Sequence, residues 1–136
     1  MNELHLFSGA GGGILAGHLL GHRCIGAVEF NPYRRRVLAQ RQRDGALPKF
    51  PLFSDIRTFD GSPYRGRADI VAGGFPCRPY SSASRGRPVE DDLWPEMRRV
   101  VADVAPRYGV WQAEPGEPRI SDELARTLDL SGGASK

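Results

Sequence analysis

Residues 3–20 read ELHLFSGAGGGILAGHLL. The first five, residues 3–7, predict a short strand that runs directly into a glycine-rich loop, and residues 14–20 have the apolar spacing of a helix that ends at Gly21. Because glycine tolerates positive φ and adds no side chain, such a loop lets the backbone approach a ligand closely. The unit indicates either a nucleotide-like cofactor, held through a phosphate or a carboxylate at the helix N-terminus, or a tight strand-to-helix turn without a ligand.

Strands and helices alternate along the rest of the chain. Apolar runs predict further strands at residues 24–28, 50–53 and 69–72. Helical spacing predicts helices over residues 32–43 and about 92–104, and the second has an apolar face formed by Leu93, Met97, Val100, Val101 and Val104. At 136 residues the chain has the length of one domain. The alternation predicts an α/β fold with a mostly parallel sheet.

Ligands of such sheets bind beyond the carboxyl ends of the strands, and the candidate residues of this chain fall there. Glu29 follows the second predicted strand and is either an acceptor for both hydroxyls of a ribose or a solvated acid. Asp55 follows the third and either accepts from an adenine amino group or caps a turn. The coincidence of these positions is a stronger signal than any one motif.

Cys77 ends the segment Gly-Gly-Phe-Pro-Cys after the fourth predicted strand. A thiolate can add to an electron-poor ring carbon, and a neighbouring cation such as Arg78 favours that form. Cys24 lies within an apolar run and is expected to be structural. Neither cysteine belongs to a Cys-x-x-Cys or Cys/His cluster, so we expect no metal site.

Composition sets broad limits on location and partners. No apolar stretch is long enough to cross a bilayer, and no secretory signal is visible, so a cytoplasmic location and no membrane partner are expected. The net charge of +3 suits a polyanionic partner or an ordinary solvated surface. Residues 78–88 have the composition of a long loop, and residues 130–136 that of a disordered tail.

These motifs, taken in order, resemble those of the DNA cytosine-5 methyltransferase family over residues 3 to about 106. The resemblance implies a Rossmann-like sheet of the kind that binds S-adenosylmethionine (AdoMet), present in incomplete form. Five segments carry it: residues 7–12, Glu29 to Tyr33, Asp55-Ile56, residues 72–81 around Cys77, and residues 93–99. The Pro-Cys loop is the specific motif, and the others corroborate it.

The resemblance also implies roles. Cys77 would attack C6 of a cytosine flipped out of double-stranded DNA, so that C5 can accept a methyl group from AdoMet. The implied cofactor-binding residues are Phe7, Ser8, Gly9, Gly11, Gly12, Glu29, Asp55, Ile56, Pro76 and Leu93. The implied DNA-binding residues are Ser81, Arg85 and Arg87.

The chain departs from the family pattern in two ways. His5 stands where the family usually has an aspartate that helps to order the glycine loop, while Arg78 and Tyr80 replace glutamine and phenylalanine. After Pro106 the family continues with a strand bearing Glu-Asn-Val, whose glutamate stabilises the protonated ring, and then with a target-recognition domain. The sequence contains no such motif, and we expect the strand and the domain to be missing too.

We therefore divide the chain into a methyltransferase part at residues 1–106, a divergent or rejoined segment at 107–129 and a tail at 130–136. The expected function is cytosine-5 methyl transfer, either absent in this chain alone or completed by another polypeptide. Alternatives are a non-catalytic AdoMet- or DNA-binding prophage remnant, one piece of a split methyltransferase, and a member that acts on tRNA. A Rossmann oxidoreductase is disfavoured because a spaced Gly-x-Gly-x-x-Gly is lacking.

Overall fold

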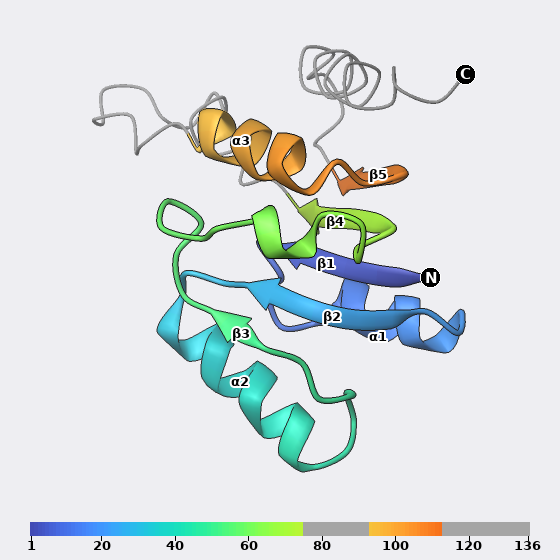
Figure 1. Ribbon diagram of the computed structural model, residues 1–136. Helices are drawn as coiled ribbons and strands as arrows, with labels where there is room; N and C mark the ends of the chain where they lie inside the picture. The colour runs from blue at the N-terminus through green and yellow to red at the C-terminus, as the bar shows by residue number, and fades with distance from the viewer. Residues whose placement is uncertain (75–92, 113–136) are drawn as a thin grey trace.

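Parallel strands form one five-stranded sheet in the computed structural model, which describes residues 1–74 and 93–112 (Figure 1). The order of the strands across the sheet is β3-β2-β1-β4-β5, so the direction of winding reverses between β1 and β4. That reversal opens the crevice in which α/β proteins bind ligands. The strands are β1 (Asn2–Leu6), β2 (Arg23–Val28), β3 (Leu52–Phe53), β4 (Ile70–Gly74) and β5 (Tyr108–Gln112).

Helices cover both faces of the sheet (Figure 1). The helices α1 (Gly12–Leu19) and α2 (Pro32–Arg43) lie on one face, and the short 3-10 helix η1 (Ser62–Tyr64) and α3 (Trp94–Val104) lie on the other. Each face has its own apolar core. On the α3 side the core includes Leu4, Leu6, Val71, Met97, Val100, Val101 and Val104, and on the α1 and α2 side it includes Ile14, Cys24, Ala27, Leu38, Leu47 and Phe50.

The alternation of β1 explains why its two faces differ in chemistry. Leu4 and Leu6 point into the α3 core, whereas Glu3 and His5 point towards α1 and are also buried. The Glu3 carboxylate lies 2.8 Å from His5 Nε2 and 2.6 Å from His22 Nδ1, which gives both of its oxygens a partner. A Cβ on Gly17 would collide with this carboxylate, so glycine is needed where α1 crosses it.

Helix α2 follows from signals that are local in the sequence. Asn31 is its N-cap and accepts the backbone N–H groups of Tyr33 and Arg34 at 3.0 and 3.1 Å, while Pro32 occupies the first turn. Leu38 is fully buried. The predicted bounds of this helix, 32–43, are therefore confirmed, as is the prediction of an α/β fold with a parallel sheet.

The strand after Pro106, expected to be missing, is present. It is β5, and its residues pair in parallel register with β4 from Ile70 opposite Tyr108 to Gly74 opposite Gln112. The expectation was wrong because the pairing partner is remote in sequence, and Gly109 interrupts the local strand pattern. Among the described residues, no helix is both long and apolar enough to cross a membrane.

Candidate functional site

The glycine loop after β1 has a backbone shape that few residues can adopt. Phe7, Gly9 and Gly11 have φ of +53°, +58° and +94°. Gly11 is also the N-cap of α1, and a Cβ there would lie 2.8 Å from Leu38 Cδ2 and 2.9 Å from Leu47 Cδ1. Glycine at position 11 is thus required by packing as well as by φ.

Gly9 and Gly12 lie in a different environment within the same loop. A Cβ at either position would meet nothing within 4 Å, so their surroundings are open. The first turn of α1 carries no acidic residue, and Gly11 provides no side-chain cap. The positive end of the helix dipole therefore faces this open space without an acidic residue in the first turn, which suits a ligand that carries a carboxylate or phosphate.

Glu29 holds the glycine loop to the end of β2. Its side chain is almost fully buried, and its Oε2 accepts the Gly9 N–H at 2.7 Å while its Oε1 accepts the Asn31 N–H at 3.2 Å. The backbone N–H of Ser8 donates to the Val28 carbonyl at 3.1 Å, which adds a second tie to β2. These bonds fix the loop before any ligand arrives.

Among the described residues, the His5 side chain makes no hydrogen bond to the glycine loop. Its imidazole bonds to Glu3 on the face below α1, and Glu29 supplies the carboxylate that the Gly9 N–H bonds to. The departure at position 5 therefore leaves the loop with a carboxylate partner. Cys24 is buried, and burial raises the pKa of its thiol to about 12, in keeping with a structural role.

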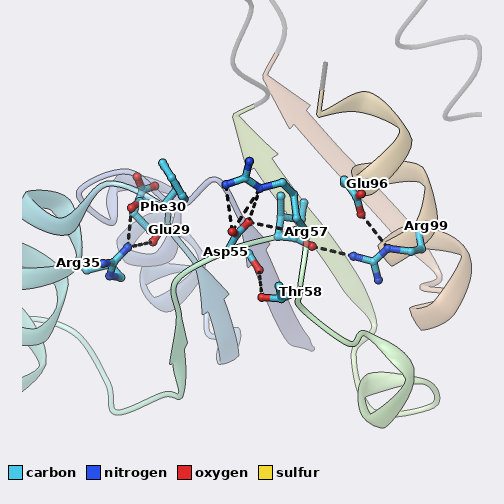
Figure 2. Close-up of polar contacts among 9 residues, drawn as sticks. Glu29, Phe30, Arg35, Asp55, Arg57, Thr58, Glu96 and Arg99 are labelled. Carbon is cyan, nitrogen blue, oxygen red and sulfur yellow. Dashed lines mark hydrogen bonds and ion pairs between the residues drawn. The ribbon is translucent and has the colours of Figure 1, made fainter. Parts of the chain in front are cut away.

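Asp55 follows β3 and is engaged within its own turn (Figure 2). Its Oδ1 accepts the backbone N–H of Arg57 at 2.9 Å and the Nε–H at 3.0 Å, and its Oδ2 accepts Nη2–H at 3.1 Å. These hydrogen bonds, those of the side chain above all, hold the pKa of Asp55 below its ordinary value. This geometry is that of the turn-capping alternative, and the adenine contact stays a prediction.

The Arg57 guanidinium also lies over the exposed ring of Phe30, with its Cζ 5.3 Å from the ring centroid. One side chain therefore touches both Asp55 and the residue after Glu29. Since both neighbours lie at the carboxyl ends of adjacent strands, the Arg57 side chain spans the two acid-bearing strand ends.

The apolar residues predicted to hold the cofactor gather on the α3 side of the sheet. Ile56 is buried in the core of that face, and Phe7 and Leu93 pack against the same core. The structure therefore brings the glycine loop, the loop after β3 and the start of α3 to one apolar cluster. Pro76, Cys77, Ser81, Arg85 and Arg87 lie outside the described residues and remain predictions.

Two residues that the sequence analysis did not single out lie near this edge. Gln112 is the last residue of β5 and pairs with Gly74, three positions before Cys77 in the sequence. The sequence of residues 107–112 contains no aspartate or glutamate. Arg99 of α3 bonds to the loop that follows Asp55 (Figure 2). Both arise from pairings distant in sequence, which periodicity does not reveal.

The family model for C-5 cytosine-specific DNA methylase matches residues 1–110. The chain is 32% identical over 107 residues to the type II methyltransferase M.NgoMIV of Neisseria gonorrhoeae, covering 77% of this chain and 33% of that protein. It is 29% identical over 129 residues to the type II methyltransferase M.Eco47II of Escherichia coli, covering 93% of this chain and 30% of that protein. The chain thus spans about a third of these relatives.

Solved structures share the fold. A protein assigned as a DNA modification methyltransferase of an Escherichia coli prophage matches with a TM-score of 0.67 at 21% identity, covering 98% of this chain and 38% of that one. DNMT2 of Spodoptera frugiperda matches with a TM-score of 0.66 at 16% identity, covering 94% and 40%. At these identities the likeness concerns the arrangement of strands and helices.

Proposed function

The chain belongs to the C-5 cytosine-specific DNA methylase family, and from that premise we propose that it is the AdoMet-binding and nucleophile-bearing part of a DNA cytosine-5 methyltransferase. The observation that carries the proposal is the loop from Phe7 to Gly12. It stands at the reversal point of a parallel sheet and is fixed by Glu29. The order and spacing of the remaining motifs support the same reading.

The donor set fits AdoMet. The open space beside Gly9 and Gly12 and the N-terminus of α1, which has no side-chain cap, suit its amino-acid carboxylate. Glu29 suits the ribose, because a carboxylate oxygen has lone pairs beyond those that the backbone N–H groups use. Ile56, Phe7 and Leu93 offer apolar surface for the adenine. When bound, AdoMet supplies the methyl group.

Cys77 would be the nucleophile. Its thiolate would form a bond to C6 of a flipped cytosine, which makes C5 electron-rich enough to be methylated. C5 would take the methyl group from AdoMet, which leaves S-adenosylhomocysteine. Loss of the C5 proton to water and release of the thiolate would then restore the 5,6 double bond. Arg85 and Arg87 would neutralise phosphates of the DNA, and Ser81 would donate to them.

The sequence of residues 107–112 bears on how fast that chemistry would run. Attack at C6 puts electron density on the ring, and an acid that protonates the ring relieves it. Gln112 is not an acid, and residues 107–112 contain no aspartate or glutamate. General acid assistance typically contributes about 10²–10⁴-fold. We therefore propose that this chain forms the covalent adduct slowly by itself, and that the remaining parts of the relatives' length would come from a further segment or a second polypeptide.

The test uses double-stranded DNA containing 5-fluorocytosine together with AdoMet. The fluorine cannot leave as a proton does, so a reacting Cys77 is trapped in a covalent adduct visible by denaturing electrophoresis. We expect the adduct with the natural chain, none with Cys77→Ser, and more with Gln112→Glu. Absence of the adduct, while the chain still binds S-adenosylhomocysteine by calorimetry, would favour a non-catalytic binding remnant. Failure to bind that ligand would overturn both readings.

A further inference from the structure

The loop of residues 54–61 carries Asp55 and Ile56, and its own backbone-to-backbone hydrogen bonds are weak. It links β3 to η1. The Asp55 carboxylate accepts the Arg57 N–H at 2.9 Å, but the bonds between backbone groups inside the turn are long. Thr58 N–H donates to the Asp55 carbonyl and Phe59 N–H to the Ile56 carbonyl, both at 3.3 Å. Such bonds are at the weak end of the range, so bonds from another element to these backbone carbonyls add to the support of the loop.

Arg99 of α3 supplies that support (Figure 2). Its Nη2–H donates to the carbonyl of Ile56 at 2.7 Å, and its Nη1–H donates to the carbonyl of Phe59 at 2.8 Å. One planar guanidinium therefore bridges both ends of the turn. The contact joins residues that are about 40 positions apart in the sequence.

The guanidinium is itself held in place by its own helix. Its Nε–H donates to Glu96 Oε2 at 2.9 Å, and its Nη1 lies 3.5 Å from Asp103 Oδ2. Helix α3 is anchored by Met97, Val100, Val101 and Val104, all fully buried. Because the fork is rigid and clamped by two carboxylates, it offers its N–H groups to the loop in one orientation.

We propose that Arg99 is a positioning residue for adenine recognition: it holds loop 54–61 in the shape that presents Asp55 and Ile56 to the cofactor. This inference rests on the proposed function, since it assigns a role within the AdoMet site. Arg99 has no contact with Asp55 in the described residues. It acts through the backbone of Ile56 and Phe59.

The chain contains a matched control. Arg65 also joins α3 to a loop through backbone carbonyls, with its Nε–H donating to the Asp103 carbonyl at 2.9 Å and its Nη2–H to the Ala102 carbonyl at 2.8 Å. It follows η1 and binds carbonyls of the helix, whereas Arg99 binds carbonyls of the cofactor loop. Removing Arg65 should weaken the attachment of α3 without releasing residues 54–61.

The experiment measures, by calorimetry on the full chain, the Kd of S-adenosylhomocysteine and of its deaminated analogue S-inosylhomocysteine, in which a carbonyl replaces the adenine amino group. Partial unfolding raises both apparent Kd values by the same factor, so their ratio reports only on adenine recognition. We expect the natural chain to favour the adenine ligand about tenfold, as for loss of one hydrogen bond to a charged group. Arg99→Ala should bring the ratio close to one, and Arg65→Ala should leave it unchanged.

Arg99→Lys separates geometry from charge. A single ammonium cannot reach Glu96 and two carbonyls at once, so we expect its ratio to lie near that of Arg99→Ala. The positioning role would be overturned if Arg99→Ala or Arg99→Lys kept the Kd ratio of the natural chain. A Kd ratio of one in the natural chain would overturn it as well. Failure of the natural chain to bind either ligand would instead overturn the proposed function.

Discussion

Glu29 and Asp55 follow the ends of the neighbouring strands β2 and β3, yet the two acids are held in different ways. Glu29 is buried and accepts a backbone N–H from Gly9, 20 residues earlier in the chain. Asp55 is more exposed, and its carboxylate is occupied by Arg57, two residues later. The first contact exists only in the folded chain, whereas the second is available to any short peptide with this sequence.

The difference indicates how each acid is prepared for a ligand. Glu29 is part of the scaffold, so changing it should damage the fold and the site together. Asp55 can exchange its arginine partner for a ligand at small cost, because exposed ion pairs contribute little. Substitution of Glu29 should therefore lower both stability and ligand binding, whereas substitution of Asp55 should lower ligand binding alone.

The largest expected effect is that of Glu29→Ala. It leaves the N–H groups of Gly9 and Asn31 without their carboxylate partner, and we expect a loss of about 2–4 kcal/mol in the free energy of unfolding. Urea denaturation followed by circular dichroism measures it, and calorimetry should find no binding of S-adenosylhomocysteine. Glu29→Gln retains one acceptor oxygen, so its free energy of unfolding should lie between those of the natural chain and Glu29→Ala. If Glu29→Ala were as stable as the natural chain, Glu29 would not differ from Asp55 in its contribution to the fold.

Gly11→Ala should come next. A Cβ there meets Leu38 and Leu47 at 2.8 and 2.9 Å, and φ of +94° disfavours alanine. We expect a loss of about 2–3 kcal/mol in urea denaturation. Gly12→Ala is the matched control, since its position is open and has an ordinary φ. It should unfold like the natural chain but bind S-adenosylhomocysteine more weakly. Equal stability of the two variants would contradict the packing argument.

Asp55→Ala should weaken the binding of S-adenosylhomocysteine about tenfold while changing the free energy of unfolding by less than about 0.5 kcal/mol. The reason is that its hydrogen bonds lie within a partly exposed turn. Calorimetry and urea denaturation on the same preparation measure the two quantities. If the free energy of unfolding fell as much as in Glu29→Ala, Asp55 would also be required for the stability of the fold.

The smallest effect is expected from Arg57→Ala. It removes the side-chain bonds to the Asp55 carboxylate and uncovers the Phe30 ring, so S-adenosylhomocysteine should bind about two- to threefold more tightly. Hydrogen bonds from Arg57 lower the pKa of Asp55, so their stabilising effect is present above the ordinary carboxyl pKa and is lost as pH falls through the lowered value. In the variant that pKa should rise, which carboxyl NMR titration measures. An unchanged pKa would show that the Arg57 side chain is not the cause of the lowered value.

Local signals made much of the fold predictable. Asn31 followed by Pro32 marks the start of α2, and the spacing of Met97, Val100, Val101 and Val104 marks the buried face of α3. Strand β5 was missed because its support is its pairing with β4. The positions of Glu29 and Asp55 at strand ends were predictable, but their partners were not. The bond from Gly9 to Glu29 joins residues 20 apart in the sequence. A turn cap at Asp55 was one of two alternatives that the sequence left open, and the structure shows that Arg57 is the partner.

The buried Glu3 carboxylate beneath α1 has a consequence for protein engineering. His5, His22 and Gly17 must all be present for it to fit, because two bond to it and the third leaves the space it fills. Residues in one network do not contribute independently. A chimaera that exchanges the first strand, or the first helix, with that of a relative would therefore combine mismatched halves of this cluster. The β1-α1-β2 unit has to be transplanted whole.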